Sequence, residues 1–263
     1  MKSALISAGV PPERLLDLAH DLPAHGVREA AFLLREMARG FPPTTVHLVV
    51  VDPGVGGRRR PVVVVTNSGP ILVGPDNGVL VPFAEELGIR RTYRIDPRRL
   101  PDRPRVGTTF DGRDLFAPAA ALLARGTPPS ALGPAVPLTP YSIPRASRSP
   151  GGARGAVLHV DRFGNLITNV PSRWIGVGAP RLRVAVGSGR ARSVPVARSY
   201  ESLGPGELGV LGSSFGLIEV AVGEGRAADR LRAGVGAPVV LAWRRRRAAR
   251  GEKDNSARPR KRR

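Results

Sequence analysis

The chain has 263 residues, a formal net charge of +20 and no cysteine. This length fits one large domain or two modest ones, and the lack of cysteine excludes disulfides, thiolate nucleophiles and cysteine-ligated metal sites. The four histidines lack metal-ligand spacing, no apolar run approaches the roughly 20 residues that span a bilayer, and we therefore expect a globular, cytoplasmic protein without a metal.

The first zone, residues 1–126, is predicted to be an α/β domain. Its strands are continuous apolar runs rich in valine, a pattern typical of sheets that are covered on both faces. The helices show apolar residues at helical spacing, and strands that alternate with helices indicate a layered α/β structure. The predicted strands are 45–52, 60–66 and 70–75, and the predicted helices are 25–40, 79–87 and 113–125.

The second zone, residues 127–150, holds seven prolines in 24 residues. Because proline supplies no backbone donor and fixes φ, we expect an extended linker.

The third zone, residues 151–243, is predicted to be a small all-β domain with a barrel-like sheet. Short β segments alternate with glycine-rich turns, as in small antiparallel sheets and barrels. We expect strands at 156–161, 165–170, 182–186, 194–199, 217–222 and 238–243, with one short helix at 226–232.

The last segment, residues 244–263, is a basic tail. It holds 11 basic and 2 acidic residues, so 11 − 2 = +9 of the +20 lies there. Arginine-rich tails bind polyanions, but Trp243 is the sole stacking residue beside it and no nucleic-acid motif precedes it. We expect a disordered, solvated tail, and nucleic acid is not expected as a partner beyond non-specific tail contacts.

The motif VDPGVGG at 51–57 places Asp52 at the end of a predicted strand. Ligands of α/β sheets collect at that edge, although a tight glycine turn capped by Asp52 is an equally good interpretation. The spacing matches neither a Walker A loop nor the dinucleotide fingerprint, which excludes P-loop NTPases and Rossmann dehydrogenases. One of the arginines at 58–60 is able to pair with Asp52, and a solvated basic turn is the alternative.

Three further segments concentrate polar residues at turns. GPDNGVL at 74–80 is typical of an Asx turn before a helix. FDGRDLFAP at 110–118 brings acidic residues to a helix start, where capping is the simplest interpretation. DRFGNLITN at 161–169 is typical of a hairpin that turns at Gly164 and Asn165.

Taken together, these segments resemble the S-adenosyl-L-methionine (SAM) hydroxide adenosyltransferase family, the SAM hydrolases, which are related to SAM-dependent fluorinases and chlorinases. The resemblance runs from residue 1 to about 243. It implies an α/β domain followed by a barrel-like domain, a homotrimer that holds SAM between subunits, and no cofactor, because SAM is the substrate. The matching segments are 15–23, 41–62, 74–80, 109–126, 160–170 and 213–222.

The resemblance implies hydrolysis of SAM to adenosine and L-methionine by attack of water at ribose C5′. The family's catalytic aspartate and arginine fall on Asp52 and Arg59. Halogenases carry a non-acidic residue at the position of Asp52, so water is favoured over halide as the nucleophile. The family's histidine is replaced here by Asp111, which either completes the catalytic set or impairs it. A halogenase and a non-catalytic SAM- or adenosine-binding protein therefore remain as alternatives.

The resemblance also assigns substrate-binding residues. Asp161 would meet the methionine ammonium, Phe163 would lie against adenine, and Asn165 would hydrogen-bond the adenine edge. Ser214 would contact the methionine end. His25 lies where relatives often carry an aromatic residue near the nucleoside, and an exposed residue at a helix start is an equal alternative.

The beginning of the printed sequence departs from the family pattern. Met1, Lys2 and Ser3 align with a run that in the family follows a first strand and a ribose-binding aspartate, so that N-terminal strand is missing here. Because loss of a buried strand is strongly destabilising, we favour a misassigned start over a truly shortened protein.

Overall fold

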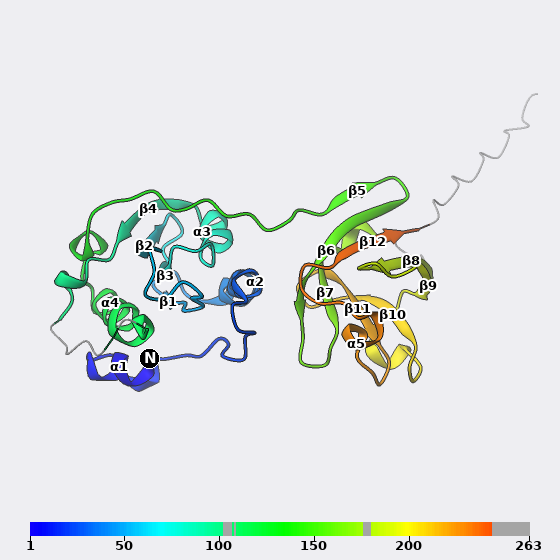
Figure 1. Ribbon diagram of the computed structural model, residues 1–263, viewed down its shortest axis with the longest axis horizontal. Helices are drawn as coiled ribbons and strands as arrows, with labels where there is room; N and C mark the ends of the chain where they lie inside the picture. Colours follow the sequence, from blue (N-terminus) through cyan, green and yellow to red (C-terminus); the bar gives the residue numbers. More distant parts are fainter. Residues whose placement is uncertain (102–106, 108, 176–179, 244–263) are drawn as a thin grey trace, which may run out of the picture.

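The computed structural model describes residues 1–101, 107, 109–175 and 180–243, which form an α/β part and a β part (Figure 1). This confirms the predicted fold class. The predicted tail at 244–263 lies outside the described residues. No helix among the described residues is long and apolar enough to cross a bilayer.

The first part is built on a four-stranded mixed sheet. Its strand order is β1-β3-β2-β4, with β1 and β3 parallel and the other pairs antiparallel. The strands are β1 (Val46–Leu48), β2 (Pro61–Thr66), β3 (Ile71–Pro75) and β4 (Ile89–Arg94). The α-helices are α1 (Lys2–Ser7), α2 (Val27–Met37), α3 (Val81–Leu87) and α4 (Ala117–Ala124). Short 3₁₀ turns lie at Pro12–Arg14, Ala38–Gly40, Pro97–Arg99 and Pro129–Leu132.

Both faces of this sheet are covered, as the valine-rich strands predict. Val62 and Val64 pack on one side against α2 and α3. Val63 and Val73 pack on the other side against α4. All four valines have no exposed surface, so the strand β2 is buried on both sides.

The predicted helix at 113–125 is divided in two. It begins as a π-helix at Gly112–Phe116 and continues as α4. Pro118 lies in the first turn of α4 and has no N–H to donate. The proline therefore leaves a gap in the helical hydrogen-bond ladder at the start of α4.

The strand β1 is shorter than the predicted 45–52 and lies at an edge of the sheet. A cavity of about 1580 Å³ runs along this edge, lined by many of the first 25 residues together with residues of α2, β1 and α4. The buried Nε2 atom of His47 on β1 has no hydrogen-bond partner among the residues that the structure describes. The expectation of a further strand upstream of Met1 stays a prediction.

The predicted linker at 127–150 is wrong over its first half, because these residues pack on the first part. Leu132 is buried in the core beside α4, and the carbonyl oxygen of Pro134 accepts a hydrogen bond from the Arg94 N–H at 2.9 Å. Proline lacks a donor but keeps its acceptor, so a proline-rich segment still pairs with the edge strand β4. The other predicted domain boundaries stay predictions.

A buried ion pair fastens this segment to the sheet. Asp76 accepts hydrogen bonds from Arg60 at 2.5 and 2.9 Å and from the backbone and hydroxyl of Thr139, both at 2.9 Å. The Asp76 side chain is 1% exposed. Asp76, in the turn after β3, therefore connects the start of β2 with the segment around Thr139, which was predicted to be part of a linker.

Replacing Asp76 with alanine is expected to lower the free energy of unfolding by about 3 kcal/mol, because it leaves Arg60 and Thr139 without their acceptor. Urea denaturation followed by circular dichroism measures this loss. The control Asp96→Ala removes an exposed pair with Arg98 and should cost much less. Equal losses in the two variants would show that the contacts of Asp76 contribute no more to stability than an exposed ion pair does.

The second part is a nearly closed antiparallel barrel. Its strand order is β10-β11-β7-β6-β12-β8-β9, with β5 paired to β6, and a bridge between Val196 and Val210 joins the two ends. The strands are β5 (Ser147–Ser149), β6 (Gly152–Val160), β7 (Leu166–Pro171), β8 (Arg181–Val186), β9 (Arg192–Pro195), β10 (Leu208–Gly212), β11 (Leu217–Val222) and β12 (Pro238–Ala242). Short 3₁₀ turns lie at Ser172–Trp174 and Tyr200–Ser202, and the helix α5 is Ala227–Leu231. This confirms the predicted barrel-like sheet.

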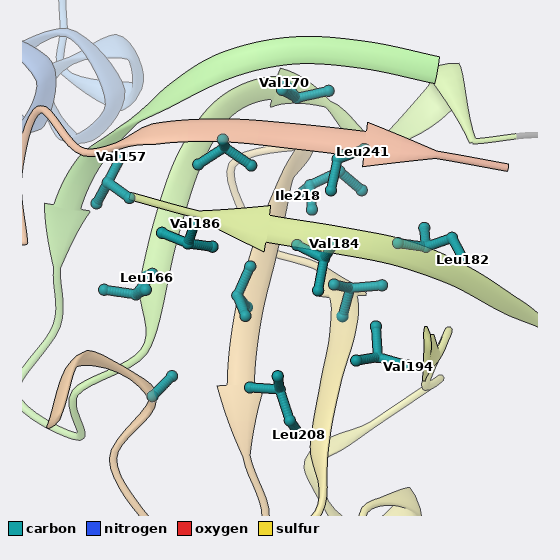
Figure 2. Packing of buried hydrophobic residues seen from close by; sticks show 14 of the residues in the cluster. Val157, Leu166, Val170, Leu182, Val184, Val186, Val194, Leu208, Ile218 and Leu241 are labelled. Atoms are coloured by element: carbon teal, nitrogen blue, oxygen red, sulfur yellow. The ribbon is translucent and has the colours of Figure 1, made fainter. Parts of the chain in front are cut away.

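Aliphatic side chains from the barrel strands fill its interior (Figure 2). Val184 and Val186 of β8, Leu241 of β12 and Leu166 of β7 point toward one another in this core. Their neighbours along each strand point outward, as strand geometry requires.

The helix α2 joins the two parts. Phe32 of α2 is buried against Leu158 and Ile167 of the barrel, and its ring meets that of Phe215 edge-on at 5.5 Å. Beside them, Glu29 of α2 pairs with Nδ1 of His159 on β6. The contact is therefore apolar at its centre with one buried polar pair.

Candidate functional site

The segment after β1 holds Asp52 in a fixed position. The Nδ2 of Asn77 donates to the carbonyl oxygen of Val51 at 2.9 Å, and the Oδ1 of Asn77 accepts from the N–H of Val79 at 3.2 Å. The GPDNGVL turn therefore ties the end of the β1 segment to the start of α3. Its Asx-turn character was predicted, but its contact with the residue before Asp52 was not.

Asp52, Arg59 and Asp111 form one buried cluster, which we call the Asp–Arg–Asp set. The Nε of Arg59 donates to Oδ2 of Asp52 at 2.8 Å, and its Nη2 lies 2.5 Å from Oδ2 of both Asp52 and Asp111. The side chains of Asp52 and Asp111 are each 5% exposed, and that of Arg59 is 11% exposed. The predicted catalytic residues therefore lie together in this chain.

The surroundings keep Arg59 charged. Burial acts to lower the pKa of the guanidinium, but the hydrogen bonds and charges of Asp52 and Asp111 outweigh it and raise the pKa. The guanidinium also lies 5.4 Å above the ring of Phe116, a favourable cation–π contact. One permanent cation thus separates two acidic groups in a site of low exposure.

One oxygen of the set is not used by the protein. Oδ1 of Asp52 is buried and has no hydrogen-bond partner among the described residues. Asp52 borders a cavity of about 340 Å³, which is also lined by Val55, Phe110 and Gly112. An acceptor beside a cavity is suited to hold a water molecule or another donor.

The β6–β7 turn holds a second group of polar residues. Oδ1 of Asp161 accepts the N–H of Asn165 at 2.8 Å, and its Oδ2 accepts the Asn165 side chain at 3.0 Å. Gly164 between them has φ +81°, a left-handed conformation that favours glycine. The predicted hairpin is present, but its β-turn spans Asp161–Gly164, with Arg162 and Phe163 at the centre in place of the predicted Gly164 and Asn165.

The other predicted binding residues are exposed. Phe163 lies at the tip of this turn, 65% exposed, with Arg162 5.4 Å over its ring. Ser214 is exposed in the β10–β11 turn, and His25 is exposed just before α2 with φ +65°. His25 lines the larger cavity along β1.

Neither of the two cavities described above is lined by both groups. Asp52 lines both cavities described above, whereas neither is lined by Asp161, Phe163 or Asn165. The structure thus assembles the predicted catalytic residues and, separately, the predicted binding turn.

The motif analysis missed a buried acidic residue near this turn. Glu219 of β11 is 3% exposed and accepts a hydrogen bond from the Tyr200 hydroxyl at 2.6 Å. Burial raises the pKa of Glu219, and the Asp161 charge raises it further, against the lowering effects of Tyr200 and His159. The alternation of strand β11 would have placed Glu219 on one face with Leu217, but no local pattern marks its partner.

No group of three potential metal ligands occurs in the described part of the chain.

The sequences of the two parts match the two domains of a known family. Residues 1–133 match the N-terminal domain of the SAM hydroxide adenosyltransferases, and residues 155–240 match their C-terminal domain. The chain therefore belongs to the SAM hydroxide adenosyltransferase family.

Relatives of this chain include characterised and uncharacterised proteins. A protein of Thermus thermophilus named (R)-S-adenosyl-L-methionine hydrolase is 40% identical, over 90% of this chain and 91% of its own. The crystal structure of an uncharacterised conserved protein from Thermotoga maritima superposes with a TM-score of 0.80 at 32% identity, covering 92% of this chain and 93% of its own. A fluorinase of Actinopolyspora mzabensis is more distant, 26% identical over 79% of this chain and 80% of its own.

Proposed function

We propose that this protein hydrolyses SAM to adenosine and L-methionine and that the Asp–Arg–Asp set activates the attacking water. The observation that carries the proposal is the unpartnered Oδ1 of Asp52 beside a cavity, in a chain of this family. Incubation with SAM and chromatographic detection of adenosine tests it. The relatives' names specify the R epimer at sulfur, so both sulfonium epimers are to be supplied.

The chemistry requires little beyond positioning. The water oxygen forms a bond to ribose C5′, while the C5′–S bond breaks and its electron pair returns to sulfur, giving neutral methionine thioether. The water proton passes to a carboxylate, for which Asp52 is the candidate. Because the sulfonium is already a good leaving group, alignment of the water contributes most of the acceleration.

A halogenase is the second enzymatic candidate, and Asp52 argues against it. A carboxylate that is 5% exposed repels a halide ion in the position where water would lie. Incubation with SAM and chloride distinguishes the two reactions, because a halogenase forms 5′-chloroadenosine.

A SAM- or adenosine-binding protein without turnover is the third candidate, because Asp111 stands where the family carries histidine. Asp111 is nevertheless held 2.5 Å from Arg59, which supports a working set. Calorimetry with SAM followed by product analysis separates binding from turnover.

Asp111→Asn is expected to reduce the rate of SAM hydrolysis by about tenfold to a hundredfold, since it removes one of the two charges that orient Arg59. Asp111→His should retain part of the activity, because imidazole is an alternative proton acceptor. Initial rates measured by adenosine release check both. An Asp111→Asn variant with wild-type rates would show that Asp111 has no catalytic role.

We assign the second group of residues to substrate binding. Asp161 is proposed to bind the methionine ammonium, Phe163 to lie against adenine and Asn165 to bind its edge. Ser214 and His25 are proposed to contact the methionine end and the nucleoside. The exposure of Phe163 at 65% supports a partner that covers it in the functional assembly. A cytoplasmic location and the absence of a cofactor stay predictions.

That assembly is proposed to be a homotrimer with SAM between subunits, because neither of the two cavities beside the Asp–Arg–Asp set is lined by the Asp161 turn. Light scattering measures the mass. Inactive Asp52→Asn and Asp161→Ala proteins should regain activity when they are mixed, dissociated and allowed to reassemble together. Some sites between subunits then combine an intact Asp–Arg–Asp set from one chain with an intact Asp161 turn from another. No recovery from correctly reassembled mixtures would contradict a shared site.

A further inference from the structure

The motif GPDNGVL at 74–80 has no role in the hydrolysis as proposed. Strand β3 lies between β1 and β2 in the sheet, parallel to β1 and antiparallel to β2. The end of β3 therefore lies at the same edge as the end of β1 and the start of β2. The connection from β1 to β2, which carries Asp52 and Arg59, has to cross the end of β3, where this motif lies. The approach is close, because a side chain at Gly74 would collide with the carbonyl oxygen of Val49.

This connection has little structure of its own. Residues 53–58 include three glycines, and all six residues except Val55 are exposed. Two backbone hydrogen bonds of 3.0 and 3.3 Å close turns within it. Because glycine-rich segments have large conformational freedom, the 2.8 Å contact between Arg59 and Asp52 depends on how the two ends of the connection are held.

The first residue after β3 holds the end of the connection next to Arg59. The N–H of Asp76 donates to the carbonyl oxygen of Arg60 at 2.8 Å, and its carboxylate accepts from the Arg60 guanidinium at 2.5 and 2.9 Å. The Asp76 side chain is 1% exposed, and an ion pair is stronger where water is excluded. The backbone that directly follows Arg59 is therefore fixed to the end of β3.

The second residue after β3 holds the end of the connection next to Asp52. The Nδ2 of Asn77 donates to the carbonyl oxygen of Val51 at 2.9 Å, and Val51 directly precedes Asp52. The Oδ1 of Asn77 accepts the N–H of Val79 at 3.2 Å. This second bond fixes the orientation of the amide, so the Nδ2 stays directed at the Val51 carbonyl.

Two consecutive residues thus hold both ends of the connection that carries the catalytic pair. We propose that Asp76 and Asn77, which we call the Asp76–Asn77 anchor, are positioning residues that set the contact between Asp52 and Arg59. This inference rests on the proposed hydrolysis of SAM. The anchor lines neither of the two cavities described above, so it acts through the Asp–Arg–Asp set and not by touching the substrate.

The test compares Asn77→Ser with the matched control Asn169→Ser. A serine hydroxyl at position 77 still supports the turn but is too short to reach the Val51 carbonyl. Asn169 makes the same two kinds of contact in the barrel, because it donates to the carbonyl oxygen of Pro144 at 2.6 Å and accepts the N–H of Ala156 at 2.8 Å. Both asparagines are partly buried, and thermal melting compares the stability of the two variants.

Asn77→Ser should lower kcat for adenosine release by about tenfold to a hundredfold, since a displacement of about 1 Å at a catalytic group has effects of that size. Its KM should change by less than about twofold, and Asn169→Ser should keep the wild-type kcat. In an Asp52→Asn background, Asn77→Ser should lower kcat by less than about twofold, because a positioning residue has no effect once the group that it positions is lost.

A second measurement does not require turnover and uses the Nε–H of Arg59. Its nitrogen–proton NMR signal is identified by its absence from the spectrum of Arg59→Lys. The hydrogen bond to Asp52 should protect this proton from exchange with solvent in the wild type, and the exchange should be about tenfold faster in Asn77→Ser. If the wild type forms no adenosine, the proposed hydrolysis fails, and the exchange rate still decides whether the anchor sets this contact.

Three results would overturn the proposal. Equal losses of kcat in Asn77→Ser and Asn169→Ser would indicate a general loss of stability. Wild-type kcat, or unchanged exchange at the Arg59 Nε–H, in Asn77→Ser would show that the anchor does not position the pair. A full additional loss of kcat in the Asp52→Asn background would assign Asn77 a role that is independent of Asp52.

Discussion

Arg59→Ala is expected to abolish SAM hydrolysis, with a loss of about 1000-fold or more in kcat. The guanidinium holds Asp52 and Asp111 through three contacts of 2.5 to 2.8 Å, and its removal leaves two buried carboxylates without a counter-charge. One of them should then take up a proton, so the arrangement that orients the water is lost. Adenosine release under single-turnover conditions measures this loss.

The same substitution should destabilise the protein. Removing one partner from a buried ionic network costs about 3 to 5 kcal/mol, which corresponds to a fall of about 10 °C in Tm for a chain of this size. Arg59→Lys should recover much of the stability but little activity, because a single ammonium does not reproduce the geometry of the fork.

The neighbouring Arg58 provides a matched control. It is exposed and lies in the same glycine-rich turn, so Arg58→Ala removes an equal charge without touching the Asp–Arg–Asp set. Its activity and melting temperature should stay near wild type. Similar losses in the Arg58 and Arg59 variants would show that the turn as a whole, and not the bridging guanidinium, is required.

The parts of this site differ in how far the sequence predicts them. Asp52 and Arg59 are seven residues apart across one glycine turn, so their pairing follows from local geometry and was raised from the sequence. Asp111 lies 52 residues beyond Arg59, and no periodicity links the two. Its place in the set was expected only through the family resemblance.

The elements of the fold also differ in how far the sequence predicts them. The strand β4 was missed because IRRTYR contains few apolar residues, and such a sequence is tolerated since β4 lies at an exposed edge. The strand β10, LGVLG, was missed because glycine argues against a strand. Proline led to the prediction of an extended linker at 127–150, although the carbonyls of Pro134 and Pro137 remain acceptors.

Asp52→Asn is expected to lower kcat for SAM hydrolysis by about 10² to 10⁴-fold while leaving KM nearly unchanged. Asparagine keeps the size of the side chain and an oxygen for the Arg59 hydrogen bond at 2.8 Å, but its neutral amide does not accept a proton from water at neutral pH. Arg59 retains Asp111 as its anionic partner, so the fold should be preserved. Rates of adenosine release and thermal melting separate the two effects.

A control on the same domain makes this result specific. Glu85 is exposed on α3, and Glu85→Gln makes the same carboxylate-to-amide change away from the cavity, so it should leave kcat at the wild-type value. If Asp52→Asn retained wild-type kcat with a normal melting curve, Asp52 would not be the proton acceptor. A rise in KM with unchanged kcat would instead mean that the Asp52 charge attracts the sulfonium, because uniform binding raises affinity without accelerating the chemical step. The ratio of the two kinetic effects therefore decides whether the unpartnered Oδ1 of Asp52 serves the water or the substrate cation.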